Sequence, residues 1–289
     1  MTIPPDFPQE WPNTYVVQDR SNQEELQRLH LQDQLVTVVL GGSLPEQADP
    51  TQFRRVLDMA CGTGGWLIEL AHTFPEISQL IGVDSSKRMI SFAHAQAEAR
   101  QVSARVEFRL MDAFSLFAFS DDLFDLANLR FALSFLRTWE WPQVLRELRR
   151  VTRGGGIIRL TEADLPDQST SPALLQLCSL LAQAYNQAWK YFRPQARGVA
   201  ADLAGLLEQQ GLHNVQTRIS RPEIQSGTVA GQLFFEDMRS LFRTNVPFLQ
   251  KWTRVPENYT DLYQQMLVEM QQPDFVVANQ TITAWGSKP

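Results

Sequence analysis

The chain has 289 residues, of which 44% are hydrophobic and 20% are charged, and its formal net charge is −6. These values are typical of a globular protein with one large domain, or one domain with a sizeable insertion. They argue against a nucleic-acid partner, since phosphate binding is driven by clustered Lys and Arg, and no uncharged apolar run approaches the roughly 20 residues that span a membrane.

The N-terminal part is predicted to form an irregular arm followed by a helix. Residues 1–20 show no periodic pattern, and the letters MTIPPDFPQEWP lack the basic and apolar regions of a secretory signal. The letters SNQE form a capping box, with Ser21 as the N-cap and Glu24 reaching back to it. Gly41 and Gly42 are predicted to end this helix.

From residue 54 to residue 163, strands and helices alternate. Apolar runs with strand periodicity are separated by segments with helical periodicity. This order predicts a parallel sheet wrapped by helices and built with right-handed crossovers. The predicted strands are residues 54–60, 79–84, 105–111, 123–131 and 157–163, and the predicted helices are residues 64–74, 86–100 and 142–151.

After residue 164, the pattern becomes mainly helical. These helices interrupt the closing strands of the sheet, so we expect them to lie over its carboxyl edge, where α/β proteins bind ligands. The predicted helices are residues 171–192, 198–212, 231–245 and 257–272, and the predicted strands are residues 213–220 and 275–286.

The stretch VLDMACGTGGW at residues 56–66 leads a strand through a glycine-rich turn into a helix. Such a turn directs backbone N–H groups and the positive end of a helix dipole at one spot. The dinucleotide fingerprint requires a third glycine where this chain has Leu67, and a phosphate-binding P-loop requires a Gly-Lys-Ser/Thr run that is missing. Asp58, ahead of the glycines, disfavours a pyrophosphate and suits a positively charged group such as an ammonium.

Two further acids follow the next strands. Asp84 ends the second strand, where a carboxylate can accept two ribose hydroxyls, and Asp112 follows the third strand, within reach of an adenine amine. Each has a simpler interpretation: Asp58 caps the turn, Asp84 caps the next helix, and Asp112 belongs to an acidic loop with Asp121 and Asp122. Together with the glycine turn, the three acids predict a nucleoside that carries an amino acid.

Residues 54–162 resemble the class I S-adenosylmethionine-dependent methyltransferases, most of all the small-molecule type typified by the ubiquinone and menaquinone C-methyltransferases. The matching motifs are VLDMACGTGGW, LIGVDSS, VEFRLMDAFSLFAFSDDLFDLANLRF and LRELRRVTRGGGIIRLTE. The resemblance implies an α/β, Rossmann-like, seven-stranded mixed sheet whose last strand is antiparallel and lies between its neighbours, with helices on both faces and a helical lid. It also implies S-adenosyl-L-methionine as the cofactor and S-adenosyl-L-homocysteine as the product.

The resemblance assigns the cofactor contacts residue by residue. Those implied around the methionine part, the ribose and the adenine are Asp58, Ala60, Gly62, Thr63, Gly64, Asp84, Ser85, Met89, Asp112 and Ala113. Those implied beside the sulfonium and the acceptor entrance are Asn128, Leu129 and Arg130. The N-terminal arm is expected to fold back over the cofactor and to offer Tyr15, Arg28 or Gln32.

No catalytic residue stands out. Many relatives carry a His shortly after the position of Arg130, but this chain has Ser134 and Phe135 there, and its four histidines form no catalytic group. Arg130 and Tyr15 are the candidates for catalysis, and the simpler interpretation of Arg130 is an ion pair with an acid at the rim. The expected acceptor pocket is aromatic, with ordinary core packing as the alternative; its candidate residues are Phe131, Phe135, Tyr185, Trp189 and Phe235.

The division of the chain is expected to be threefold. Residues 1–50 form an arm and a helix covering the cofactor mouth, residues 51–165 form the cofactor-binding core, and residues 166–289 complete the core and carry lid insertions at about 166–198 and 225–273. Cys61 and Cys178 are far apart and lack metal-ligand spacing, which favours a cytoplasmic location and no metal site.

The predicted function is in-line methyl transfer from S-adenosylmethionine to a small, apolar or aromatic acceptor in a closed pocket. One alternative is a protein that binds the cofactor without transferring methyl. Another is a nicotinamide-dependent oxidoreductase, which Leu67, Asp58 and the lack of a Tyr-x-x-x-Lys pair disfavour. The most basic stretch, residues 146–153, is interpreted as a solvated helix end, with a local nucleic-acid patch as the alternative. The acceptor, the methylated atom and the oligomeric state are left open.

Overall fold

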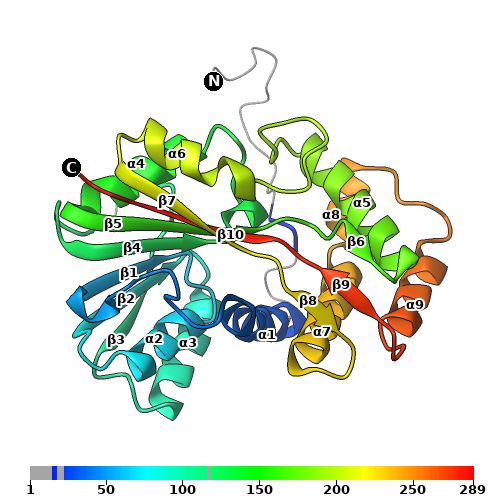
Figure 1. Cartoon of the computed structure of the whole chain (residues 1–289), viewed down its shortest axis with the longest axis horizontal. Helices are drawn as coiled ribbons and strands as arrows, with labels where there is room; N and C mark the ends of the chain where they lie inside the picture. The colour runs from blue at the N-terminus through cyan, green and yellow to red at the C-terminus, as the bar shows by residue number, and fades with distance from the viewer. Residues whose placement is uncertain (1–14, 18–22, 116–117) are drawn as a thin grey trace.

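The computed structural model describes residues 15–17, 23–115 and 118–289. Its main element is a seven-stranded sheet in the order β3-β2-β1-β4-β5-β10-β7 (Figure 1). Strand β10 is antiparallel to both of its neighbours, whereas the pairs among β1 to β5 are parallel. The predicted mixed sheet with an inserted antiparallel last strand is therefore confirmed. The strands are β1 (Arg55–Met59), β2 (Gln79–Asp84), β3 (Val106–Leu110), β4 (Phe124–Arg130), β5 (Thr152–Ala163), β7 (His213–Ser220) and β10 (Thr281–Ser287).

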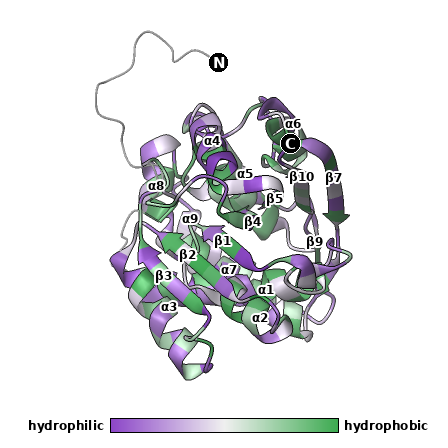
Figure 2. Cartoon of the chain, turned by 90° about the vertical axis from the view of Figure 1, so that its left-hand side faces the viewer, coloured by the Kyte–Doolittle hydropathy of each residue, from purple (hydrophilic) through white to green (hydrophobic). Residues whose placement is uncertain are grey.

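The central strands are apolar on both faces because helices cover both faces of the sheet. On β1, Val56 belongs to one buried cluster and its neighbour Leu57 to the other. The cluster of Val56 includes residues of α2 (Gly65–Thr73) and α3 (Lys87–Ala99), and the cluster of Leu57 includes residues of α4 (Trp141–Val151) and α6 (Leu203–Gln209). Figure 2 shows the contrast between the apolar strand β2 and helix α3, which mixes polar and apolar residues. This two-sided cover matches the expected Rossmann-like layers.

A second, mainly helical region lies beside the main sheet (Figure 1). A three-stranded sheet, ordered β6-β9-β8, accompanies its helices. Helix α1 packs along α7 and joins the N-terminal part of the chain to this region. The elements are α1 (Gln23–Leu40), β6 (Gln168–Ser169), α5 (Pro172–Gln187), β8 (Glu223–Gln225), α7 (Val229–Thr244), α8 (Val246–Trp252), α9 (Tyr259–Glu269) and β9 (Val276–Ala278), and the short 3-10 helices are η1 (Pro50–Gln52), η2 (Ala132–Ser134) and η3 (Ala200–Asp202).

Several boundaries differ from the sequence-based expectations. The predicted helix 171–192 ends at Gln187, and Trp189 just beyond it has a left-handed φ of 56°. The predicted strand 275–286 is divided into β9, which joins the small sheet, and β10, which joins the main sheet. The short elements α8, β6 and β8 were not predicted, because a few residues carry too little periodicity.

Two further expectations concern the N-terminus and the membrane. Helix α1 begins at Gln23 in the described part of the chain, and the predicted cap Ser21 lies outside the described residues, as does most of the predicted arm. Across residues 15–17, 23–115 and 118–289, no helix is long and apolar enough to cross a membrane.

Candidate functional site

A cavity of about 510 Å³ lies at the carboxyl ends of the parallel strands. Ligands of doubly wound sheets bind at this edge, and a cavity of this size accommodates a drug-sized ligand. One wall comes from the ends of β1, β2, β4 and β5, and the opposite wall comes from α1, α5 and α7. Most predicted site residues line it: Tyr15, Arg28, Gln32, Asp58, Ala60, Gly62, Thr63, Asp84, Ser85, Met89, Asp112, Ala113, Arg130, Phe131, Phe135 and Tyr185.

Three predicted cofactor residues do not reach the cavity lining. Gly64 is the N-cap of α2 with a φ of 76°, and a Cβ added there would lie 2.4 Å from the ring of Phe108. Asn128 and Leu129 are buried within β4. Gly64 therefore allows α2 to approach the sheet closely, which is a conformational role.

Two predicted acceptor residues also lie elsewhere. Trp189 is 39% exposed and its ring packs against the rings of Trp139 and Trp252. Phe235 is half-buried on α7, whereas its neighbour Phe234 lines the cavity. For these two aromatic residues, the structure favours ordinary packing, because the helix ends before Trp189 and α7 presents the adjacent ring to the cavity.

The glycine turn is tied to the start of α3 by Asp84. The carboxylate of Asp84 accepts the backbone N–H of Gly62 at 3.0 Å and that of Ser86 at 2.8 Å. Ser86 is the N-cap of α3, and its hydroxyl accepts the N–H of Met89. The capping role considered for Asp84 thus belongs to Ser86. Asp84 instead shapes the wall of the cavity, where Ala60 and Gly62 both have left-handed φ angles.

Asp58 presents a buried carboxylate to the cavity. Its Oδ1 accepts a hydrogen bond from Asn128 Nδ2 at 2.7 Å, and its buried Oδ2 has no partner among the described residues. Burial raises the pKa of Asp58 to about 6, against the opposing effects of Arg130 and the Asn128 hydrogen bond. Because a buried acceptor without a partner is costly, this oxygen fits a donor that comes with a ligand.

Asn128 is the positioning residue for Asp58. Its Oδ1 accepts a hydrogen bond from Arg159 at 2.8 Å, and Arg159 forms a fully buried ion pair with Glu46, also at 2.8 Å. This series of contacts, from Glu46 through Arg159 to Asn128, orients the Asn128 amide so that its N–H₂ group donates to Asp58.

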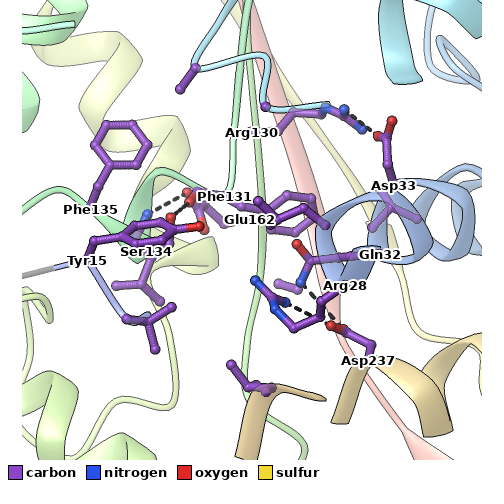
Figure 3. Close-up of a pocket in the computed structure, with 18 of the residues that line it drawn as sticks. Tyr15, Arg28, Gln32, Asp33, Arg130, Phe131, Ser134, Phe135, Glu162 and Asp237 are labelled. Carbon is purple, nitrogen blue, oxygen red and sulfur yellow. Dashed lines mark hydrogen bonds and ion pairs between the residues drawn. The ribbon is translucent and has the colours of Figure 1, made fainter. Parts of the chain in front are cut away.

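Arg130 is held to α1. Its guanidinium pairs with Asp33 at 2.6 Å and lies 5.5 Å from the ring centre of Trp66. Both Arg130 and Asp33 line the cavity, so the ion pair with an acid at the rim, considered from sequence, is present (Figure 3). A guanidinium engaged in this way forms part of the wall of the site, and it carries hydrogen-bond donors and no acceptor.

A buried ionic network joins α1 to α7 at the cavity (Figure 3). Arg28 pairs with Glu25 at 2.7 Å and with Asp237 at 2.8 Å, and all three side chains are nearly inaccessible. Gln32 also reaches Asp237, at 3.4 Å, and Tyr15 donates to Glu25 at 2.8 Å. Arg28 and Gln32, expected at the cofactor, thus form a contact between helices while they line the cavity, and their contact with the cofactor stays a prediction.

Burial changes the acid–base character of this network. Burial and the Glu25 carboxylate raise the pKa of Tyr15 well above its usual range. Burial also raises the pKa of Asp237, although Arg28 opposes the effect. Tyr15 therefore keeps its proton at neutral pH and does not suit the role of a base.

Glu162 is a cavity residue that sequence reasoning missed. It lies near the end of β5, is 2% exposed, and its Oε1 accepts the backbone N–H of Leu133 at 3.1 Å. Burial raises its pKa to about 8. The available signal was its position, because it lies next to the end of the fifth strand, as Asp84 lies at the end of the second.

Much of the remaining acceptor-side lining is apolar. These residues come from the N-terminal arm, η2, the loop after β5, β8, α5 and α7: Val16, Leu133, Leu165, Leu181, Ile224, Phe234, Met238 and Leu241. For those on α5 and α7, the available signal was the apolar face of each helix. In the described part of the chain, no group of three or more His, Cys, Asp or Glu side chains could hold a metal ion.

The basic stretch at residues 146–153 forms the end of α4 and the start of β5. Arg150 pairs with Glu147 at 2.6 Å and with Asp121 at 2.5 Å, and Arg153 pairs with Asp125 at 2.6 Å. These acids offset the positive charge locally. The absence of a nucleic-acid partner stays a prediction.

Comparisons with known proteins agree with this geometry. Residues 56–156 match the family described as Methyltransferase domain. The demethylmenaquinone methyltransferase of Lactiplantibacillus plantarum is 33% identical over 171 residues, which are 55% of this chain and 70% of the relative. The YcgJ protein of Bacillus subtilis superposes with a TM-score of 0.52 at 17% identity, over 90% of this chain and 99% of that chain. A phosphoethanolamine N-methyltransferase 2 of Haemonchus contortus, in complex with S-adenosylhomocysteine, has a TM-score of 0.51 at 14% identity, over 96% of this chain and 60% of that chain.

The sheet order, the glycine turn and the acids at the strand ends define a Rossmann-like protein of the methyltransferase class. The chain belongs to the class I S-adenosylmethionine-dependent methyltransferases, and it resembles their quinone methyltransferases. It is a methyltransferase enzyme with S-adenosylmethionine as its cofactor.

Proposed function

We propose that this enzyme methylates a small, apolar or aromatic acceptor by in-line transfer, in the part of the cavity between the strand ends and α1, α5 and α7. One observation carries the proposal: a single cavity has acids at strand ends on one side and, on the other, apolar and aromatic side chains of η2, α5 and α7 beside the paired charges of Glu25, Arg28 and Asp237. The similarity to a demethylmenaquinone methyltransferase supports an acceptor with a quinone-like aromatic ring. Acceptor and cofactor would then meet inside one cavity.

The strand ends would hold the cofactor. Asp58 offers its unpartnered Oδ2 to the amino group, and Asp84, next to the glycine turn, faces the ribose. Around the methionine part we place Ala60, Gly62 and Thr63, and around the adenine we place Ser85, Met89, Asp112 and Ala113. When bound, S-adenosylmethionine supplies an electrophilic methyl carbon attached to a positively charged sulfur.

The helices would hold the acceptor. Phe131 and Phe135 flank η2, Tyr185 comes from α5, and all three line the cavity. Positive charge disperses in the transition state of this transfer, so an apolar wall that excludes water and aligns the acceptor supplies much of the rate. This account explains how methyl transfer proceeds without an obvious catalytic histidine.

The same lining supports the threefold division of the chain. Residues from α1, α5 and α7 lie across the cavity from the strand ends, as expected for an arm and a lid over a cofactor-binding core. We also propose a cytoplasmic location, because Cys61 and Cys178 are both free and buried, as is common where thiols stay reduced.

The test is turnover with a panel of acceptors. The purified chain is incubated with S-adenosylmethionine and with naphthohydroquinones, phenols, aromatic amines and aliphatic alcohols, and products are identified by mass spectrometry. We expect a product that is one methyl group heavier from an aromatic acceptor. Binding of S-adenosylhomocysteine without a methylated product from any member would contradict the proposal and favour a cofactor-binding protein that transfers no methyl group.

A matched pair of variants locates the acceptor. Phe131→Ala changes a ring in the cavity wall, whereas Phe235→Ala changes a half-buried ring of α7 outside that wall. We expect the first variant to lose acceptor turnover and the second to keep it. The reverse result would place the acceptor elsewhere.

A further inference from the structure

Glu162 lies at the acceptor side of the cavity, where strand β5 and a hydrogen bond hold its side chain. Its Oε1 accepts the N–H of Leu133, which belongs to η2 (Ala132–Ser134). This turn separates Phe131 and Phe135, both of which line the cavity together with Glu162 (Figure 3). The carboxyl group is thus held by a strand and a backbone hydrogen bond, among the rings proposed to bind the acceptor.

Glu162 differs from the other acids on this side of the cavity. Glu25 and Asp237 are both tied to the guanidinium of Arg28. The hydrogen bond to Glu162 comes from a neutral amide, so its carboxylate is not neutralised by a direct ion pair with Arg28. Compared with Glu25 and Asp237, Glu162 therefore has the greater capacity to take up a proton.

The surroundings place its titration near neutrality. Burial dominates and raises the pKa of Glu162 to about 8, Asp164 raises it further, and the amides of Leu133 and Ala132 lower it. Lys190 also lowers it from the opposite side of the turn, where its Nζ donates to the carbonyl of Leu133 at 2.9 Å. The elements around the cavity carry further titratable or charged side chains that line it: Tyr15, Glu25, Arg28, Asp33, Asp58, Asp84, Asp112, Arg130, Arg137, Glu140, Tyr185 and Asp237.

Resting on the proposed methyl transfer, we propose that Glu162 is the catalytic base, and that the acceptor carries an ionisable hydroxyl group on an aromatic or enolic framework. The carboxylate takes the proton of that hydroxyl. The electron pair left on the acceptor forms a bond with the methyl carbon while the bond from that carbon to sulfur breaks, and its electrons stay on sulfur. If a ring carbon attacks instead of the oxygen, the ring hydrogen leaves as the proton; in both cases one methyl group is gained and one proton is lost.

This role requires the ionised form of Glu162, so the rate should rise with pH. Below a pH of about 8 the free enzyme holds the carboxyl group mostly protonated, and above it mostly ionised. The pH profile of kcat/KM reports groups of the free enzyme. Transfer to a simple alkylphenol, whose hydroxyl titrates at a pH of about 10 and so above the midpoint of this range, should therefore show a rising limb with an apparent pKa near 8.

The decisive variant is Glu162→Gln. Its amide oxygen can still accept the Leu133 N–H, so the turn is kept while the base is lost. We expect a loss of about 100-fold or more in kcat, an unchanged affinity for S-adenosylhomocysteine, and a flat pH profile. A positioning role for the turn alone predicts instead that Glu162→Gln keeps the rate and pH profile of the wild type, and that result would overturn the assignment.

A second variant and a spectroscopic measurement guard against a folding defect. Lys190→Met removes the hydrogen bond to the Leu133 carbonyl but keeps Glu162. Burial lowers the pKa of Lys190 to about 7, so Lys190 is mostly uncharged where Glu162 titrates, and we expect this variant to keep the rising limb near pH 8. Infrared difference spectra of wild type minus Glu162→Gln should show a carboxylic acid band that disappears through a pH of about 8. A band absent at all pH values, or a profile without the rising limb in Lys190→Met, would also overturn the assignment.

The two proposals fail in different ways. If the wild type methylates no acceptor in the panel, the proposed function fails and this assignment fails with it. If the wild type methylates only acceptors without a hydroxyl group, the proposed function stands and this assignment alone is wrong.

Discussion

The two ends of the cavity depend on different kinds of sequence information. At the end proposed to hold the cofactor, the lining residues lie at or just after the ends of β1, β2 and β3. Asp58 and Asp84 belong to strand–turn–helix units, and Asp112 belongs to the loop just after β3. At the acceptor end, the wall comes from α1, β5, α5 and α7, and the paired residues Arg28 and Asp237 are 209 positions apart. Local motifs therefore build the first end, whereas the second exists only once distant helices have packed together.

The two ends also treat buried charge differently. At the cofactor end, Asp58 keeps one buried oxygen without a partner in the described part of the chain. At the acceptor end, Glu25, Arg28 and Asp237 satisfy one another. Asp58 can therefore form a further interaction with a ligand. The network of Glu25, Arg28 and Asp237 is a structural contact that is complete without one.

The largest effect should come from removing the cation that joins α1 to α7. Arg28→Met leaves Glu25 and Asp237 buried near each other without a positive charge, and we expect the free energy of unfolding to fall by about 3–5 kcal/mol. Asp237→Asn leaves the Glu25–Arg28 pair intact, and we expect it to cost about 1 kcal/mol. Denaturant titration measures both, and equal losses would show that the network does not behave as one ionic unit.

The glycine turn should be the next most sensitive. Gly64→Ala places a Cβ at 2.4 Å from the Phe108 ring and at a φ of 76°, so strain and overpacking together should cost about 2–4 kcal/mol. Gly62→Ala has nothing within 4 Å of the new Cβ, and its φ of 53° alone should cost about 1 kcal/mol. Similar losses in thermal and denaturant unfolding would mean that Phe108 moves aside.

The ribose-binding role of Asp84 predicts a smaller, ligand-specific loss. Asp84→Ala removes acceptors for two hydroxyls and the contacts to Gly62 and Ser86. S-adenosylhomocysteine should bind at least tenfold more weakly in calorimetry, which corresponds to about 1.4 kcal/mol, and the fold should survive. Asp112→Ala is the matched control: its exposed side chain accepts the nearby Phe114 N–H, so the loss should be less. An unchanged dissociation constant for Asp84→Ala would assign Asp84 to turn geometry alone.

The smallest effect should be a pH dependence of cofactor binding. Ionised Asp58 attracts an ammonium group, and its pKa is about 6 in the free protein. The affinity for the cofactor should therefore reach its full value above that pH. It should decline as the pH falls through that value, by about tenfold between pH 7 and pH 5. Asp58→Asn should bind more weakly at neutral pH and show no such dependence. A wild-type affinity that stays constant over this range would contradict the assigned ammonium contact.

The sequence by itself determined the alternation of strands and helices, the parallel part of the sheet and the side of the cavity that is proposed to hold the cofactor. The reason is that apolar periodicity, a glycine turn and acids at strand ends are local properties, which act within a few residues; the antiparallel last strand was expected only from the resemblance to the methyltransferases. Parallel strands then bring Asp58, Asp84 and Asp112 to one edge without further information.

Only the tertiary structure decided the rest. The run at residues 275–286 reads as one strand, yet its two halves pair with different sheets. Trp189 and Phe235 have the aromatic character expected of an acceptor pocket, yet neither lines the cavity. Helix α5 ends before Trp189, and on α7 the preceding residue, Phe234, faces the cavity instead of Phe235. The sequence suggested a cofactor contact for Arg28, and only the packing of α7 shows that it also pairs with Asp237. Glu162 looked like an ordinary strand residue, and only the structure shows that its carboxylate accepts a hydrogen bond from η2. Each of these outcomes depends on which distant side chains meet, and that is set by packing between elements far apart in the chain.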